Sequence, residues 1–227
     1  MSDFWIIVPV KDTRYSKQRL AERLTPVQRR KLALTMLEDV LDAVAPVQDE
    51  ARLVLVTIDP DVIKLAQRIG ADSIADGAHD GHTGAVTAAA EALAQAGGEG
   101  FLTVPGDIPL ATTDEVRRIL TVHHGQERPA FTIAPSHDER GSNAIACSPV
   151  DGVPLQFGDD SYLPHLAAAR SRGIAPKVLT LAGISEDIDT PQDLERVSTI
   201  EGIETTRTYA LLREFCDAGL VSTESSR

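Results

Sequence analysis

Residues 4–10 read FWIIVPV, an apolar run rich in β-branched residues. A run with no polar residue on either face is typical of a strand buried on both sides, as in a parallel sheet. Residues 53–58 (LVLVTI) repeat the pattern. Between the two runs the apolar residues have helical spacing, with Thr25 as the N-cap, Pro26 in the first turn and Gln28 completing a capping box. This order of strand, helix and strand predicts an α/β fold.

The rest of the chain alternates in the same way. Further strands are expected at residues 72–75, 101–104, 131–134, 144–147 and 177–181, and further helices at 62–69, 83–96, 113–123, 163–172 and 191–197. Such alternation predicts one domain, residues 1–219, with a mostly parallel sheet covered by helices on both faces. Residues 220–227 are expected to form a disordered tail. Ligands of such sheets bind beyond the carboxyl ends of the strands, so the polar segments there are the candidate sites.

Composition excludes several classes of protein. The 227 residues carry a formal net charge of −12, whereas a generic nucleic-acid binder needs a basic excess. No apolar stretch approaches the ~20 residues that span a bilayer, and the first residues do not resemble a signal peptide. Cys147 and Cys216 have neither metal-ligand nor disulfide-framework spacing, so buried thiols in a reducing cytoplasm are expected.

The first polar segment, VPVKDTRYSKQRL, leaves the end of the first strand and carries Lys11, Arg14, Lys17 and Arg19. So much positive charge in an acidic protein indicates a site for a polyanion such as triphosphate. A solvated loop that pairs with surface carboxylates explains the same charges equally well. There is no Walker-type glycine-lysine loop and no Gly-x-Gly-x-x-Gly fingerprint, which argues against those two nucleotide-binding architectures.

Three aspartates are candidate metal ligands. Asp107 follows an apolar strand and a Pro-Gly break, which places it at the carboxyl edge of the sheet. Asp187 and Asp189 are two residues apart, so in an extended segment both side chains point to one side, and a cation between them would relieve their repulsion. Mg²⁺ prefers such oxygen ligands together with substrate phosphates. The alternative for Asp107 is a turn residue, and for Asp189 or Thr190 a helix cap.

Two further loops suit an anion. The segment APSHDERGSNAIA carries Ser142 and Asn143 beside a glycine, and FGDDSYLPH carries Gly158 and Ser161 before a helix. A hairpin turn and a plain N-cap at Ser161 are the ordinary alternatives. His165 lies inside that helix, where a satisfied, partly buried histidine is the expected role.

In this order and spacing the five segments resemble the 2-phospho-L-lactate guanylyltransferase family (CofC or FbiD) of coenzyme F-420 biosynthesis. The stretches VPVK…SKQRL, VPGDIPL, RGSNAIA, FGDDSYLPH and DIDTPQDL carry the resemblance. It implies a three-layer nucleotide-diphospho-sugar transferase-like (GT-A, MobA-like) fold. It also implies that GTP condenses with a phosphorylated three-carbon acid (2-phospho-L-lactate, phosphoenolpyruvate or 3-phospho-D-glycerate), releasing pyrophosphate.

The resemblance also assigns roles by motif. Magnesium would be held by Asp107, Asp187 and Asp189, which with Lys17 form the catalytic set. The nucleotide would meet Lys11, Arg14, Lys17, Arg19, His82, Thr83 and Asp107. The acceptor acid would meet Ser142, Asn143, Gly158 and Ser161. Where the family carries a Leu-Asn pair near residue 82, this chain has His82-Thr83, which leaves the base open.

Two other functions remain as alternatives. A molybdenum-cofactor nucleotidyltransferase would carry a glycine-rich first loop, and no glycine lies between Pro9 and Leu24. A non-catalytic nucleotide-binding module would tolerate the loss of one aspartate, and this chain keeps all three. The expected partners are GTP and a small phosphorylated acid, with neither nucleic acid nor membrane, and a homodimer stays open.

Overall fold

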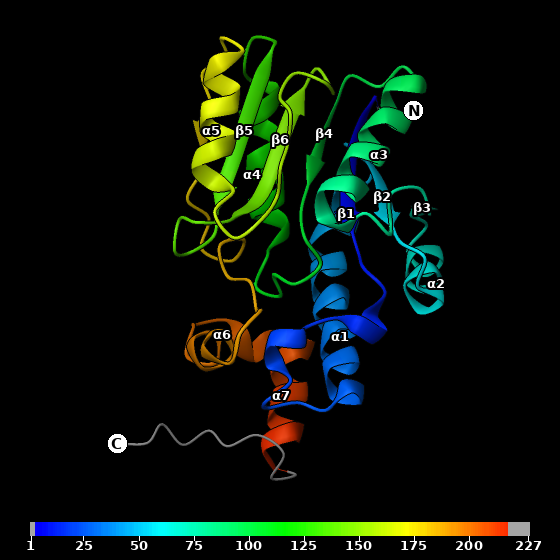
Figure 1. The fold of residues 1–227 in the computed structure, drawn as a ribbon, viewed down its shortest axis with the longest axis vertical. Helices are drawn as coiled ribbons and strands as arrows, with labels where there is room; N and C mark the ends of the chain where they lie inside the picture. The colour runs from blue at the N-terminus through cyan, green and yellow to red at the C-terminus, as the bar shows by residue number, and fades with distance from the viewer. Residues whose placement is uncertain (1–2, 218–227) are drawn as a thin grey trace.

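The computed structural model describes residues 3–217 and has the predicted alternation of strands and helices (Figure 1). The strands are β1 (Phe4–Pro9), β2 (Arg52–Val56), β3 (Asp72–Ile74), β4 (Gly100–Thr103), β5 (Ala130–Pro135), β6 (Ser142–Ser148) and β7 (Lys177–Val178). The helices are α1 (Pro26–Val44), α2 (Pro60–Arg68), α3 (Gly81–Gln95), α4 (Thr113–His124), α5 (Tyr162–Ser171), α6 (Pro191–Val197) and α7 (Arg207–Asp217). The predicted tail, 220–227, lies outside the described residues.

All seven strands form one sheet in the order β3-β2-β1-β4-β6-β5-β7. Among these strands only β6 runs against its neighbours, so the sheet is mixed and mostly parallel, as predicted. The reversal of β6 matters for the site. In the β4–β6 pair Thr103 lies opposite Ile145, so the first residues of β6 lie beyond the carboxyl end of β4.

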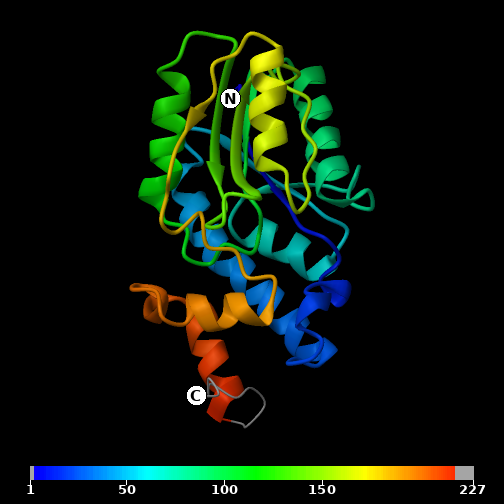
Figure 2. The same cartoon turned by 60° about the vertical axis from the view of Figure 1, so that its left-hand side comes forward.

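Helices cover both faces of the sheet, which makes three layers (Figure 2). In β1 the side chains alternate: Ile6 and Val8 pack with α1, α2 and α4, while Trp5 and Ile7 pack with α3 and α5. Burial of both sets explains why this strand is apolar without interruption. No helix within residues 3–217 is long and apolar enough to cross a bilayer.

A third apolar cluster joins α6 and α7 to the amino-terminal half of α1. In Figure 1, α6 and α7 lie below the sheet. The cluster comprises Leu20, Leu24, Leu32, Met36, Leu110, Ile188, Leu194, Val197, Ile203, Leu211, Leu212 and Phe215. The helix α7 is a finding of the structure, since the sequence motifs did not indicate it. Asp39 of α1 stabilises the first turn of α7, because its carboxylate accepts from the backbone N–H groups of Arg207 and Thr208, both at 2.9 Å.

Two of the predicted helix starts are confirmed in detail. Thr25 and Gln28 form the predicted capping box of α1, and Thr190 caps α6 in a second box with Asp193. The expected strand at 177–181 is shorter than predicted. The N–H of Leu179 still donates to Ile133, but the chain then leaves the sheet and Leu181 packs into the core.

Candidate active site

Two adjoining hollows open at the edge of the sheet where β1 and β4 end. The large hollow, about 890 Å³, lies under the loops after β5 and before α5 and α6. The small hollow, about 450 Å³, lies between the loop after β1 and the start of α3. The two share Lys11, Arg19, Gly81, His82, Pro105, Asp107, Asp159 and Asp189. Ligands of α/β sheets bind at this edge, as predicted.

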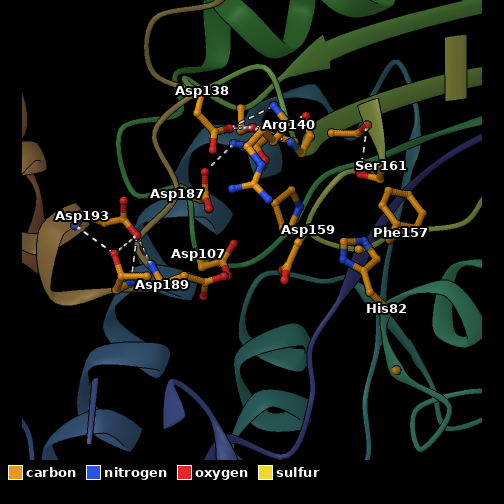
Figure 3. Close-up of a pocket in the computed structure, with 18 of the residues that line it drawn as sticks. His82, Asp107, Asp138, Arg140, Phe157, Asp159, Ser161, Asp187, Asp189 and Asp193 are labelled. Atoms are coloured by element: carbon orange, nitrogen blue, oxygen red, sulfur yellow. Dashed lines mark hydrogen bonds between the residues drawn. The ribbon is translucent and has the colours of Figure 1, made fainter. Parts of the chain in front are cut away.

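The three predicted aspartates meet at the large hollow. Ile188 is fully buried in the third cluster, so the alternation of an extended segment turns Asp187 and Asp189 together toward the hollow. The N–H of Ile188 donates to the carbonyl oxygen of Asp107 at 3.1 Å, which joins the acidic segment to the turn after β4. The three carboxylates thus line one cleft, as a shared ligand would require (Figure 3).

Lys17 lies between two of these carboxylates. Its Nζ is 2.6 Å from Asp107 Oδ2 and 2.6 Å from Asp189 Oδ1. Burial alone would lower the pKa of Lys17, but the two carboxylates raise it above its usual value, so the ammonium stays charged. The backbone of Lys17 is left-handed, with φ 53°, a conformation that non-glycine residues rarely adopt and that concentrates at functional sites. The cationic and acidic segments are thus in direct contact.

Asp187 is the carboxylate without an ammonium partner. Burial and the charge of Asp107 raise its pKa to about 6. The amide of Asn143 donates to Asp187 Oδ1 at 3.1 Å and to the carbonyl of Ile184 at 3.0 Å, so Asn143, a predicted acceptor contact, holds the acidic segment. The large hollow is lined by seven aspartates against three cationic side chains, those of Lys11, Arg19 and Arg140, and this negative excess fits a further cation.

A cation here would need ligands from outside the chain. Within residues 3–217 no three His, Cys, Asp or Glu side chains are grouped closely enough to hold a metal by themselves. Mg²⁺ does not require such a cage, because it binds through one or two carboxylates and completes its shell with water and substrate phosphates. The donor set of Asp107, Asp187 and Asp189 therefore fits Mg²⁺ that arrives together with phosphates.

The helix α6 fixes the acidic segment from below. Asp193 accepts from the backbone N–H groups of Asp189 and Thr190 at 3.1 and 2.8 Å. Arg196 donates to the carbonyl of Asp187 at 3.3 Å and pairs with Glu186. The alternative that Thr190 caps a helix is therefore also correct, and it explains how Asp189 is aimed rather than competing with a role in the site.

The cationic loop divides into residues that face the hollows and one that does not. Lys11 and Arg19 line both hollows. Arg14, predicted to meet the nucleotide, lines neither. It is exposed, and its guanidinium donates to the carboxylate of Asp12 in three bonds of 2.5 to 3.1 Å. We therefore leave Arg14 out of the site.

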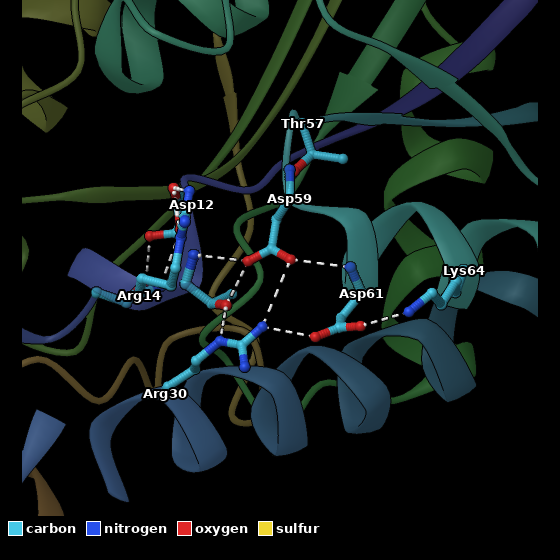
Figure 4. A network of polar contacts seen from close by, with 9 residues as sticks. Asp12, Arg14, Arg30, Thr57, Asp59, Asp61 and Lys64 are labelled. Atoms are coloured by element: carbon cyan, nitrogen blue, oxygen red, sulfur yellow. Dashed lines mark hydrogen bonds and ion pairs between the residues drawn. The ribbon is translucent and has the colours of Figure 1, made fainter. Parts of the chain in front are cut away.

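Asp59 is a functional candidate that the sequence analysis did not include. Its carboxylate accepts from the backbone N–H of Thr13 at 2.9 Å and from the Thr13 hydroxyl, and it also caps α2 (Figure 4). Burial alone would raise the pKa of Asp59, but these hydrogen bonds lower it below the usual value. Asp59 thereby anchors the cationic loop beside the small hollow. The Asp59-Pro60 pair indicates a helix start. Nothing in the local sequence indicates the contact between Asp59 and Thr13, which are 46 residues apart.

The start of α3 contacts the loop before α5. The ring of His82 stacks on Phe157, with 4.0 Å between centroids, and Thr83 Oγ1 accepts from the backbone N–H of Phe157 at 2.9 Å. His82 and Thr83, predicted to meet the nucleotide, both line the large hollow, and His82 also lines the small one. Burial lowers the pKa of His82 to about 4, so its ring is neutral at pH 7.

The remaining predicted residues lie on the far wall of the large hollow. Ser142 starts β6, Gly158 belongs to the loop before α5, and Ser161 precedes α5. Ser161 stands at the N-cap position of α5, as the alternative expected, but its hydroxyl makes no cap bond and instead donates to Ser142 Oγ at 3.3 Å. The reversal of β6 brings Ser142 to this edge.

The chain is similar to known proteins in both sequence and fold. The chain is 36% identical to the phosphoenolpyruvate guanylyltransferase of Sphaerobacter thermophilus, over 85% of this chain and 91% of that protein. It is 31% identical to the 3-phospho-D-glycerate guanylyltransferase of Colwellia psychrerythraea, over 86% and 91%.

Among solved structures, a protein from Desulfovibrio desulfuricans assigned to the nucleotide-diphospho-sugar transferases superimposes with a TM-score of 0.74 at 23% identity, over 97% of both chains. Glucosyl-3-phosphoglycerate synthase from Mycobacterium tuberculosis, solved with Mg²⁺ and UDP, gives 0.57 at 14% identity, over 94% of this chain and 79% of that one. The predicted nucleotide-diphospho-sugar transferase-like fold is confirmed. The model of the CofC-like guanylyl transferases matches residues 4–224, and this chain accordingly belongs to that family of nucleotidyltransferases.

Proposed function

We propose that the protein transfers GMP from GTP to a phosphorylated three-carbon acid with Mg²⁺ as cofactor, releasing pyrophosphate, as a cytoplasmic step of coenzyme F-420 biosynthesis. The observation that carries the proposal is the placement of Asp107 and Asp189 at the junction of the two hollows with Lys17 between them. Two relatives act, by name, on phosphoenolpyruvate and on 3-phospho-D-glycerate.

The two hollows suggest where each substrate lies. Apolar residues of the small hollow, Val56, Ala78 and Ala85, suit a base, and Lys11 and Lys17 beside them suit its phosphates. The far wall of the large hollow, with Ser142 and Ser161, suits the anionic acid. Gly158 lines the same hollow, and a Cβ added there would meet no atom within 4 Å, so its backbone is open to a ligand.

The proposed reaction needs alignment rather than a protein base. An oxygen of the acid's phosphate is already a nucleophile at neutral pH and forms a bond to the α-phosphorus, while the bond from that phosphorus to the bridging oxygen of pyrophosphate breaks. Lys17 and Arg19 stabilise the charge that collects on the leaving pyrophosphate. Asp107, Asp187 and Asp189 would hold Mg²⁺, which when bound neutralises charge on the phosphates.

The test is a matrix of GTP, ATP, CTP and UTP against phosphoenolpyruvate, 3-phospho-D-glycerate and 2-phospho-L-lactate, with pyrophosphate release and product mass as readouts. We expect release only with GTP, one of the acids and Mg²⁺ together. Replacing Asp189 with Asn should abolish release while the protein stays folded. Nucleotide binding without release for every acid would favour the non-catalytic module, and turnover with CTP would show that His82-Thr83 accept another base.

A further inference from the structure

His165 of α5 is buried just behind the far wall of the large hollow, with 1% of its surface exposed. It does not line the hollow itself. Both ring nitrogens have partners: Nε2 lies 2.9 Å from the backbone N of Gln156, and Nδ1 lies 2.9 Å from Ser142 Oγ. Phe157 packs edge-on against the ring, with 5.1 Å between centroids, which holds the ring plane in place.

These partners determine which nitrogen of His165 carries the proton. The backbone N–H of Gln156 is an obligatory donor, so Nε2 must accept. Burial lowers the pKa of His165 to about 4, so the ring is neutral at pH 7 and has one proton only. That proton is therefore on Nδ1, and Nδ1–H donates to Ser142 Oγ.

The hydroxyl of Ser142 then has its own proton left over. A hydroxyl oxygen accepts two hydrogen bonds and donates one. Ser142 Oγ accepts from His165 Nδ1–H and from the hydroxyl of Ser161 at 3.3 Å. With both acceptor positions used, the Ser142 proton is the free group, and Ser142 lines the large hollow. A phosphate or carboxylate offers only acceptors, so this arrangement matches an anion.

We propose that His165 is a positioning residue for the acceptor acid: through its Nδ1–H it directs the Ser142 hydroxyl proton into the large hollow to bind the acid's anionic group. This inference rests on the proposed function for the identity of the ligand, and on the contacts of Gln156, His165 and Ser142 for the direction of the proton. His165 itself touches no substrate. If Nδ1 of His165 were an acceptor, the Ser142 hydroxyl would donate its proton to that nitrogen and would have none to offer to the hollow.

Two substitutions at His165 separate positioning from packing. His165→Asn places an amide N–H near the position of Nδ1 and so keeps a donor to Ser142. His165→Phe keeps the ring but has no donor. Both lose the bond from the Gln156 N–H. Phe keeps the packing of the ring without the donor to Ser142, and Asn keeps the donor without the ring, so the variant that retains the affinity shows which of the two matters.

A histidine far from the site provides the control. His123 of α4 is 2% exposed and also bonds two side chains, Thr132 at 3.2 Å and Ser148 at 2.9 Å, but lines neither hollow. His123→Phe should lower the Tm as His165→Phe does and leave the KM for the acid unchanged.

The measurement is the KM for phosphoenolpyruvate and for GTP in each variant. Ser142→Ala should raise the KM for the acid about 10- to 100-fold, the range expected for a hydrogen bond to a charged group. His165→Phe should raise it about 5- to 10-fold with the KM for GTP within about twofold, and His165→Asn should restore most of the loss. In the Ser142→Ala background, His165→Phe should add nothing. Equal losses in Asn and Phe, or additive losses, would overturn the proposal.

A second readout separates this inference from the proposed function. If the wild type releases no pyrophosphate with any acid, the proposed function fails, and ¹⁵N chemical shifts of the His165 ring still report the tautomer. A protonated Nδ1 supports the network, and a proton on Nε2 overturns it.

Discussion

Asp187 should destabilise the fold that it serves. Its carboxyl is partly buried near Asp107, and its pKa is raised from 3.8 to about 6. A folded-state pKa above the unfolded value means that the folded protein prefers the protonated form. Its contribution to stability is therefore lost as the pH rises from about 4 through 6, and at pH 7 the ionised group opposes folding. We predict that Asp187→Asn makes the protein more stable at pH 7 and inactive.

The size of the effect follows from the same shift. The pKa rises by about two pH units, which corresponds to about 3 kcal/mol. Partial exposure reduces this to about 1–2 kcal/mol, or about 2–8 °C in Tm for a domain of this size. The Asn oxygen can still accept the bond that Asn143 donates to Asp187 Oδ1, so no buried donor is left unpaired.

The assay is urea unfolding of wild type and Asp187→Asn in EDTA, from pH 4.5 to 8. The stability gained by the variant should grow with pH and level off above about pH 7, and Mg²⁺ with GTP should stabilise the wild type more than the variant. Asp160→Asn is the control, because this exposed carboxylate has its pKa lowered by Arg140 and should show no gain. A less stable Asp187→Asn protein at pH 8 would refute the electrostatic reasoning.

Other substitutions test the cationic loop after β1 and the residue that anchors it. Lys17→Met should lower kcat at least about 100-fold, measured as pyrophosphate release, because it removes the cation at the leaving group. Arg19→Ala should raise the KM for GTP several-fold, whereas Arg14→Ala should leave it unchanged and shift the free energy of unfolding by less than about 0.5 kcal/mol. Asp59→Ala should lower the unfolding free energy by about 2–3 kcal/mol, seen in urea, and raise the KM for GTP, since Thr13 loses its anchor.

Local patterns predicted much of the sheet and the acidic half of the site. The run from residue 4 to 10 is apolar because it packs against helices on both faces, so its composition alone indicated a central strand. The alternation of Asp187, Ile188 and Asp189 predicted the direction of the two carboxylates for the same reason, because burial of Ile188 turns both of them to the other side of the segment. Where one side of an extended segment is buried, the alternation of apolar and polar residues along it shows to which side each side chain points.

Contacts between distant segments escaped the sequence analysis. The reversal of β6 depends on pairing with β4 and β5, which local composition does not encode. The same holds for Lys17, which was predicted to form the catalytic set with the three aspartates. It lies between two of them, 90 and 172 residues away in the chain. His165 was predicted to be a satisfied histidine, and it is satisfied, but its role depends on which partners satisfy it.

The third apolar cluster explains why the charged loops hold their geometry. Leu20 follows Lys17 by three residues and Ile188 precedes Asp189 by one, and both apolar side chains are fully buried in that cluster. Because one packed core fixes both backbones, Lys17 and Asp189 can stay in contact without a direct chain connection. Leu211 and Phe215 of α7 complete this core, and no residue of α7 lines either hollow. A search for polar motifs therefore overlooks α7, although the placement of the charges depends on a core that it helps to close.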